Sequence, residues 1–205
     1  MTTHLEPATS TCGTPAGSGE APAPARSCMG IVDEAARLER AGLSVIHLEK
    51  GELDIDTPQL ITDLAIEGLR KQRTRYSHST GLTELRHAIC DHMGRQYGVD
   101  VDISQVIVNS GSSPAMLELF LAVLEPGDEV ILPDPGYPAY PSFVEAARGK
   151  VVRANAAEDG FAHTAELAAR QITAATKAVV TNFPANPTGC VAGPDELRAF
   201  AELGP

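Results

Sequence analysis

The segment Lys177–Gly189, KAVVTNFPANPTG, combines a predicted strand with the turn that follows it. Its first part is a short apolar run, Ala178–Thr181, which predicts a buried strand. Its second part, Asn182–Gly189, is dense in proline and glycine and predicts a turn directly after that strand. In α/β sheets, ligands bind at the carboxyl ends of strands. This turn is therefore a candidate site.

The chain around this segment alternates strands with helices. Such alternation predicts an α/β fold of three layers, in which helices cover both faces of a mostly parallel sheet. The earlier strands are expected at 105–108, 129–132 and 150–153, and the helices between and after the strands at 114–124, 139–147, 165–172 and 195–203. Three further helices are expected upstream, at 31–41, at 58–70 with Thr57 as N-cap, and at 82–97 with Gly98 closing it.

Composition and charge argue against several classes of protein. The 16 basic and 27 acidic side chains give a formal charge of −11, which disfavours a nucleic-acid binder and a polybasic membrane surface. No apolar run approaches the roughly 18 residues that a membrane span needs, and no secretory signal is visible at the start. The cysteines form no C-x-x-C pair, which favours ordinary thiols in the cytoplasm: Cys12, Cys28, Cys90 and Cys190.

Two other predicted strand ends carry residues suited to a ligand. In Asn109–Pro114, Gly111 lets the backbone approach a ligand closely, and Ser112 and Ser113 add hydroxyl donors at a helix start. A phosphate there would gain charge-assisted hydrogen bonds of roughly 1.5–3 kcal/mol each. The alternative is that Ser113 simply caps the helix.

The second of these strand ends is Pro133–Tyr140, where Tyr137 sits on a proline-rich turn and has a ring suited to stacking on a planar heteroaromatic ligand. The alternative is a tyrosine that plugs the edge of the core. In the turn Asn182–Gly189, Asn186 has an amide able to donate or accept a hydrogen bond. A lone Asn-Pro turn would mean little, because such turns are common in loops.

Four segments in this order resemble one enzyme family. Gly51–Pro58, GELDIDTP, is similar to the family motif G-E-P-D-F-x-T-P, and Tyr76–Arg86, YSHSTGLTELR, to Y-x-x-x-x-G-x-x-E-L-R. The other two are the serine loop with the tyrosine turn, and the Asn-Pro-Thr-Gly turn. From about residue 28 to residue 205 the chain resembles the class I/II aminotransferases, fold type I enzymes that use pyridoxal 5′-phosphate. Leu53 and Lys50 depart from the family pattern near the substrate side.

The resemblance implies a role for each of these residues. Gly111, Ser112 and Ser113 would bind the cofactor phosphate, Tyr137 would stack on its pyridine ring, and Asn186 would hydrogen-bond its phenolic oxygen. Tyr76 would reach the phosphate of a partner subunit in a homodimer, unless it is a rim tyrosine packed on its own helix. Gly51 would lie near the substrate carboxylate, unless it is a simple turn glycine. No metal site is implied.

The resemblance also implies a division into domains and the absence of the Schiff-base lysine. Residues 1–28 are expected to form a disordered tail, 29–58 an N-terminal helix and arm, and 59–205 the N-terminal part of a large cofactor-binding domain whose sheet is incomplete in this chain. In the family, the Schiff-base lysine follows the Asn-Pro-Thr-Gly turn. None of the lysines here fits that role: Lys50, Lys71, Lys150 and Lys177.

The expected function is therefore amino-group transfer between an amino acid and a 2-oxo acid, with this chain inactive alone. A different hypothesis is a non-catalytic half-domain that binds or regulates a full-length relative. A Rossmann-type nucleotide binder is disfavoured, because no G-x-G-x-x-G follows a strand.

Overall fold

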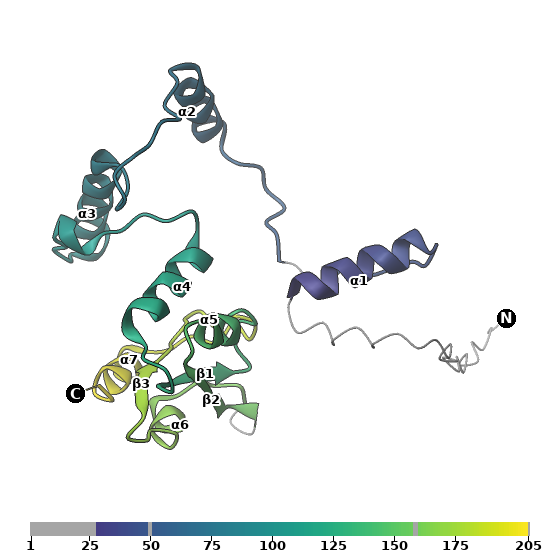
Figure 1. The fold of residues 1–205 in the computed structure, drawn as a ribbon, viewed down its shortest axis with the longest axis vertical. Coiled ribbons are helices and arrows are strands. Elements are labelled where there is room, and N and C mark those ends of the chain that lie inside the picture. The colour runs from purple at the N-terminus through teal and green to yellow at the C-terminus, as the bar shows by residue number, and fades with distance from the viewer. Residues whose placement is uncertain (1–27, 49–50, 158–159, 205) are drawn as a thin grey trace. The chain divides into compact units, whose positions relative to one another are not determined.

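The computed structural model describes residues 28–48, 51–157 and 160–204 (Figure 1). The chain divides into two compact units, 1–49 and 50–205. In the first unit the described part is α1 (Cys28–Arg40) and the stretch that follows it. The helix carries an ion pair one turn apart, Arg37 to Glu34 at 2.6 Å, and Gly42 follows it with a φ of 85°. The helix predicted from apolar spacing at 31–41 is thus confirmed.

The second unit contains a small sheet and most of the helices. Its helices before the sheet are α2 (Gln59–Arg70), α3 (Thr83–Tyr97), the 3-10 turn η1 (Ile103–Gln105) and α4 (Ser112–Val123). The strands and helices that follow are β1 (Glu129–Asp134), α5 (Tyr140–Ala146), β2 (Lys150–Asn155), α6 (Ala165–Ala169), β3 (Thr176–Val179) and α7 (Pro194–Ala201).

The three strands are parallel and lie in the order β2-β1-β3 (Figure 1). Ile131 in the central strand faces Val152 on one side and Val179 on the other. Because all three strands run the same way, the turns that follow them emerge at one edge of the sheet. The predicted parallel α/β fold is confirmed.

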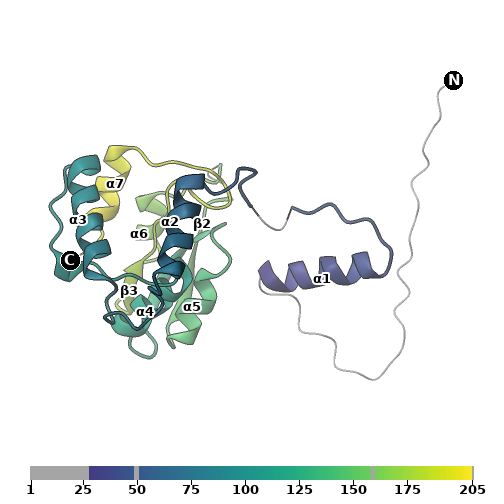
Figure 2. The ribbon, with the colours of Figure 1, turned by 90° about the horizontal axis from the view of Figure 1, so that it is seen from above.

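Side chains of β1 alternate between two apolar clusters. Val130 and Leu132 pack with α4 and α5, whereas Ile131 packs with α6 and α7. These three side chains are at most 1% exposed, and burial of each contributes about 1.5–3 kcal/mol. Figure 2 shows α5 and α6 on opposite sides of the strands, so the sheet is the middle of three layers.

The strand predicted at 105–108 is wrong. Residues 103–105 form η1, and Val106–Val108 continue without strand pairing among the described residues. The Asp102 carboxylate accepts the Ser104 amide at 2.8 Å and Gln105 completes a capping box, which favours the turn. The Val-Ile-Val pattern is strand-like, but a strand also needs a neighbour to pair with.

Two predicted boundaries also shift. The strand expected to end at Leu132 continues to Asp134 through Pro133, which has no amide to donate. Pro133 is tolerated because this end of β1 is in register with β2 alone, opposite Ala154. Pro58, rather than Thr57, occupies the N-cap of α2, and it provides no side-chain cap.

Candidate functional site

The candidate site lies at the carboxyl edge of the sheet. The tyrosine turn follows β1 and the Asn-Pro-Thr-Gly turn follows β3, and these strands are hydrogen-bonded neighbours. The Val180 amide extends that pairing by donating to the Ile131 carbonyl at 2.9 Å. Two of the three turns singled out in the sequence are therefore brought to one edge.

The tyrosine turn is held by β1 and α5. Tyr137 is half-buried and meets Tyr140 edge to face, with ring centroids 5.2 Å apart. Burial and then the neighbouring Tyr137 raise the pKa of Tyr140, so its hydroxyl stays protonated near neutral pH. Below the turn, Asp134 lies 3.9 Å from the Arg153 guanidinium on β2. The Tyr137 ring is thus held by its contact with Tyr140, and the ion pair between Asp134 and Arg153 joins the start of the turn to β2.

The Asn-Pro-Thr-Gly turn is closed by its own hydrogen bonds. The Ala185 amide donates to the Cys190 carbonyl at 2.7 Å, and the Gly189 amide donates to the Ala185 carbonyl at 2.7 Å. The Asn186 amide donates to the Asn182 carboxamide oxygen at 3.1 Å. These hydrogen bonds fix the backbone on both sides of Asn186, and Asn186 itself is exposed. Asn186 therefore lies exposed on a hydrogen-bonded turn at this edge.

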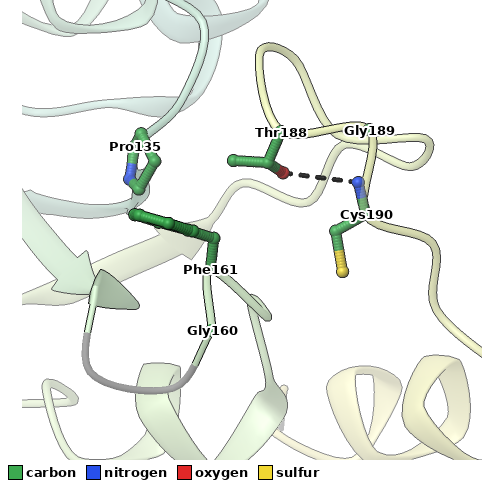
Figure 3. Close-up of a pocket in the computed structure, with 6 residues that line it drawn as sticks. All are labelled: Pro135, Gly160, Phe161, Thr188, Gly189 and Cys190. Atoms are coloured by element: carbon green, nitrogen blue, oxygen red, sulfur yellow. Dashed lines mark hydrogen bonds between the residues drawn. The ribbon is translucent and has the colours of Figure 1, made fainter.

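A cavity of about 540 Å³ lies between these two turns and the loop after β2 (Figure 3). Pro135 lines it from the tyrosine turn, Gly160 and Phe161 from the loop, and Thr188, Gly189 and Cys190 from the Asn-Pro-Thr-Gly turn. Tyr137 and Asn186 flank this lining in sequence without being part of it. The carboxyl edge thus offers a ligand-sized hollow between the two predicted turns.

The serine loop begins α4. Gly111 is the N-cap, with φ 111° and ψ 173°, a conformation that is open to glycine almost exclusively. Ser112 and Ser113 are the first two residues of the helix and are exposed. Ser113 therefore does not occupy the N-cap. The free amides and the two hydroxyls at this helix start suit an anion. These three residues do not line the cavity of Figure 3.

The two remaining predicted site residues, Tyr76 and Gly51, belong to segments that precede the sheet in the sequence, and both are exposed. Tyr76 projects fully into solvent from a loop, and a hollow of about 690 Å³ is lined by Thr74, Arg75, Tyr76 and Ser77. Gly51 begins the irregular stretch before α2, and a Cβ added there would meet nothing within 4 Å. Neither lines the cavity between the two turns.

Three lysines fall in the described part of the chain, and none of them lines the cavity between the two turns. Lys71 follows α2 and pairs with Glu67. Lys150 is the first residue of β2, about 16 Å from the carboxyl end of that strand at 3.3 Å per residue. Lys177 is the second residue of β3, in the amino-terminal half of a short strand.

Sequence reasoning missed Phe161, which lines the cavity although it is not in any motif. It has a φ of 65°, uncommon for an aromatic residue, and its side chain is half-exposed. Its amide donates to the Ala156 carbonyl at 2.9 Å, which folds the loop back over the end of β2. The Gly-Phe pair shortly after a strand was the available signal.

Two negative findings apply to residues 28–48, 51–157 and 160–204. No group of three or more histidine, cysteine or acidic side chains is arranged to hold a metal ion. No helix in these ranges has the length and apolar character required to cross a bilayer.

The sequence model of "Aminotransferase class I and II" matches residues 44–204, most of the chain. The chain belongs to the class I and II aminotransferase family. The matched region includes β1, β3 and the turns that follow them. The aminotransferase resemblance read from the four motifs is confirmed.

Individual relatives support the assignment. The chain is 39% identical over 171 residues to the aspartate/prephenate aminotransferase of Thermus thermophilus, covering 83% of this chain and 44% of that protein. It is 39% identical over 176 residues to the aspartate aminotransferase of Geobacillus stearothermophilus, covering 85% and 45%. The chain spans about half the length of the curated relatives it matches.

Solved structures agree. The aspartate aminotransferase of Thermus thermophilus with maleate superposes with a TM-score of 0.80 at 38% identity, covering 86% of this chain and 46% of that one. The aspartate aminotransferase of Rhizobium meliloti gives a TM-score of 0.80 at 31% identity, covering 90% and 48%.

Proposed function

We propose that this chain carries the phosphate- and ring-binding part of an aminotransferase site that uses pyridoxal 5′-phosphate. The observation that supports this most is the pairing of two family motifs at one sheet edge, where the turns after β1 and β3 border a common cavity. The cofactor, when bound, withdraws electrons from the amino-acid Cα. The protein's part is to bind and orient it.

The available groups fit the parts of this cofactor. The phosphate would bind at the start of α4, where the Gly111 conformation leaves the helix amides open and Ser112 and Ser113 add hydroxyls. The pyridine ring would stack on Tyr137, whose own ring is held edge-on by Tyr140. The Asn186 amide would donate to the phenolic oxygen.

Two roles depend on an assembly or a substrate. We assign Tyr76 to the cofactor phosphate of a partner subunit in a homodimer, a role that its complete exposure permits. We assign Gly51 to the neighbourhood of the substrate carboxylate. In this scheme residues 29–58 are an N-terminal helix and arm, and 59–205 are part of the cofactor-binding domain.

The 205-residue chain is proposed to lack turnover by itself. Transamination needs a lysine amine that attaches the cofactor and moves a proton between Cα and the cofactor carbon. None of the three described lysines lines the cavity: Lys71 follows α2, Lys150 begins β2 and Lys177 is the second residue of β3. Lys50 lies outside the described residues and matches no lysine motif of the family.

The substrates proposed are an amino acid and a 2-oxo acid. The relatives reported above are named as aspartate or aspartate/prephenate aminotransferases, which makes aspartate the first amino donor to test. A cytoplasmic location is proposed from the cysteine pattern, and Cys90 and Cys190 are both free thiols in the structure. The hypothesis of a non-catalytic module gains no support from relatives that are themselves named as enzymes.

Titration of the purified chain with pyridoxal 5′-phosphate, followed by its absorbance, tests this proposal. Noncovalent contacts to one dianion supply several kcal/mol, which corresponds to dissociation constants of roughly millimolar to tens of micromolar. We expect reversible binding that is lost when Ser112 and Ser113 are both changed to alanine. Ser142→Ala, on the exposed surface of α5, is the matched control. Equal binding by the double variant would refute the phosphate assignment.

A further inference from the structure

Two family motifs far apart in the sequence are joined by contacts that none of the roles above explains. The Val108 amide, just before the serine loop, donates to the Thr80 carbonyl at 3.0 Å. Thr80 belongs to the same motif as Tyr76. Gly81 lies directly against Val108, so that a Cβ added to Gly81 would be 2.6 Å from the Val108 Cβ. With a φ of 101°, Gly81 is a position that only glycine occupies without strain.

A second connection runs through Arg86, the last residue of that motif and part of α3. Its Nε donates to the Val106 carbonyl at 2.8 Å, and its terminal nitrogen donates to the Ile103 carbonyl. The Val106 carbonyl lies in the segment that was expected to be a strand, the Ile103 carbonyl lies in η1 just before it, and Arg86 is half-buried. At Val106 the guanidinium satisfies an acceptor that a neighbouring strand would otherwise satisfy, and its planar fork suits two acceptors at once.

These contacts fix the approach to the serine loop. Only Asn109, Ser110 and Gly111 separate Val108 from the first residue of α4. The chain therefore has little freedom between the anchored segment and the first turn of the helix. Val106 itself is 8% exposed, which adds packing to the hydrogen bonds.

We propose that Arg86 is a positioning residue for the phosphate-binding turn Gly111–Ser113, acting through the segment Ile103–Val108. Gly81 provides the close contact that keeps the Tyr76 loop against the same segment. The inference rests on the proposed function in one respect, that Gly111–Ser113 bind the phosphate group of the cofactor. Arg86 itself touches neither cofactor nor substrate in this scheme.

Amide hydrogen exchange on the purified chain tests the positioning directly. Arg86→Gln should accelerate exchange about tenfold at the Val108 amide and at the Met116 amide, which closes the first turn of α4. The buried amides of Val130 and Ile131 should not change. Arg86→Lys should restore part of the protection, because the lysine ammonium still donates hydrogen bonds but lacks the planar fork that suits both carbonyls. Arg95→Gln, on the exposed side of α3 and paired with Asp91 at 4.0 Å, is the matched control.

Binding of two aldehyde-free probes supplies the functional readout. Pyridoxine 5′-phosphate carries the phosphate and pyridoxine does not, and neither reacts with lysine. We expect Arg86→Gln to weaken binding of the phosphate compound by about fivefold while leaving pyridoxine unchanged, with partial recovery in Arg86→Lys. A purely structural arginine would weaken both compounds alike.

The hydrogen-exchange experiment tests the positioning role of Arg86, and the probe-binding experiment also tests the proposed function. Unchanged exchange at Val108 and Met116 in Arg86→Gln, or equal acceleration throughout the sheet, overturns the positioning role. If the unaltered chain binds neither probe, the proposed function fails, and the exchange comparison still upholds or overturns the connection between Arg86 and the turn.

Discussion

Replacing Gly149 with alanine should destabilise the sheet, because the added methyl has no room. Gly149 lies in the turn from α5 to β2, where a Cβ would be 2.9 Å from Leu124 Cδ1 and 3.0 Å from Val144 Cγ1. Val144 is completely buried and Leu124 nearly so, so neither side chain can move aside without disturbing the cluster between α4, α5 and β1. Overpacking of this kind costs about 1–3 kcal/mol.

Urea unfolding followed by far-UV circular dichroism measures this cost. At an m-value of about 1–3 kcal/mol/M, the midpoint should fall by roughly 1 M with the slope unchanged. Gly68→Ala is the control, because a Cβ there meets nothing within 4 Å and α2 gains helix propensity. Its midpoint should stay the same or rise. A Gly149→Ala midpoint equal to that of the unaltered chain would show that the packing argument is wrong.

Three further outcomes are expected. Borohydride reduction with pyridoxal 5′-phosphate, analysed by mass spectrometry, should leave no stoichiometric adduct at any single lysine; a unique labelled site would contradict this. Tyr137→Ala should weaken binding of pyridoxine and of pyridoxine 5′-phosphate by the same factor, about two- to tenfold in fluorescence titrations, because the ring contact is shared. Burial of His163 lowers its pKa, with the Glu196 carboxylate opposing, so the unfolded chain takes up the extra proton. The free energy of unfolding should therefore fall as pH drops below about 6.5, and His163→Phe should remove that dependence in urea titrations at pH 5 to 7.

The surroundings of His163 explain the choice of phenylalanine. Its ring packs against Phe183, in the segment that carries Asn186, and against Phe200 on α7, with centroid distances of 6.3 and 5.3 Å, and the two phenylalanine rings are 6.0 Å apart. Its Nε2 is buried with no hydrogen-bond partner among the described residues. A buried unsatisfied donor or acceptor costs about 1–3 kcal/mol, so the variant should be at least as stable as the parent at neutral pH.

Apolar periodicity was sufficient to predict most of the elements, because β1, β2, α4 and α5 form the core and their patterns follow from burial. The strand at 105–108 failed for a non-local reason. Its residues favour a strand, but the Arg86 guanidinium and the capping box at Asp102 satisfy polar groups there instead. No local pattern indicates that the side chain of an arginine twenty residues earlier will donate a hydrogen bond to the Val106 carbonyl.

The candidate site shows the same division. The rule that parallel strands end at one edge was sufficient to place the turns after β1 and β3 together. The path of the loop after β2 was not predictable in this way, because Phe161 reaches the cavity through a left-handed backbone conformation. The burial of His163 depends on two aromatic rings 20 and 37 residues away in sequence, which only the folded chain brings together.

The central claim is that three separate turns form one cofactor site, and amide chemical-shift mapping with pyridoxine 5′-phosphate tests it most directly. The probe cannot react with lysine, so shifts report noncovalent binding. We predict that the largest changes fall together on the serine loop, the tyrosine turn and the Asn-Pro-Thr-Gly turn, at Gly111, Ser112, Ser113, Tyr137 and Asn186, with one common dissociation constant. Changes confined to a single turn, or turns that titrate with different constants, would contradict the account.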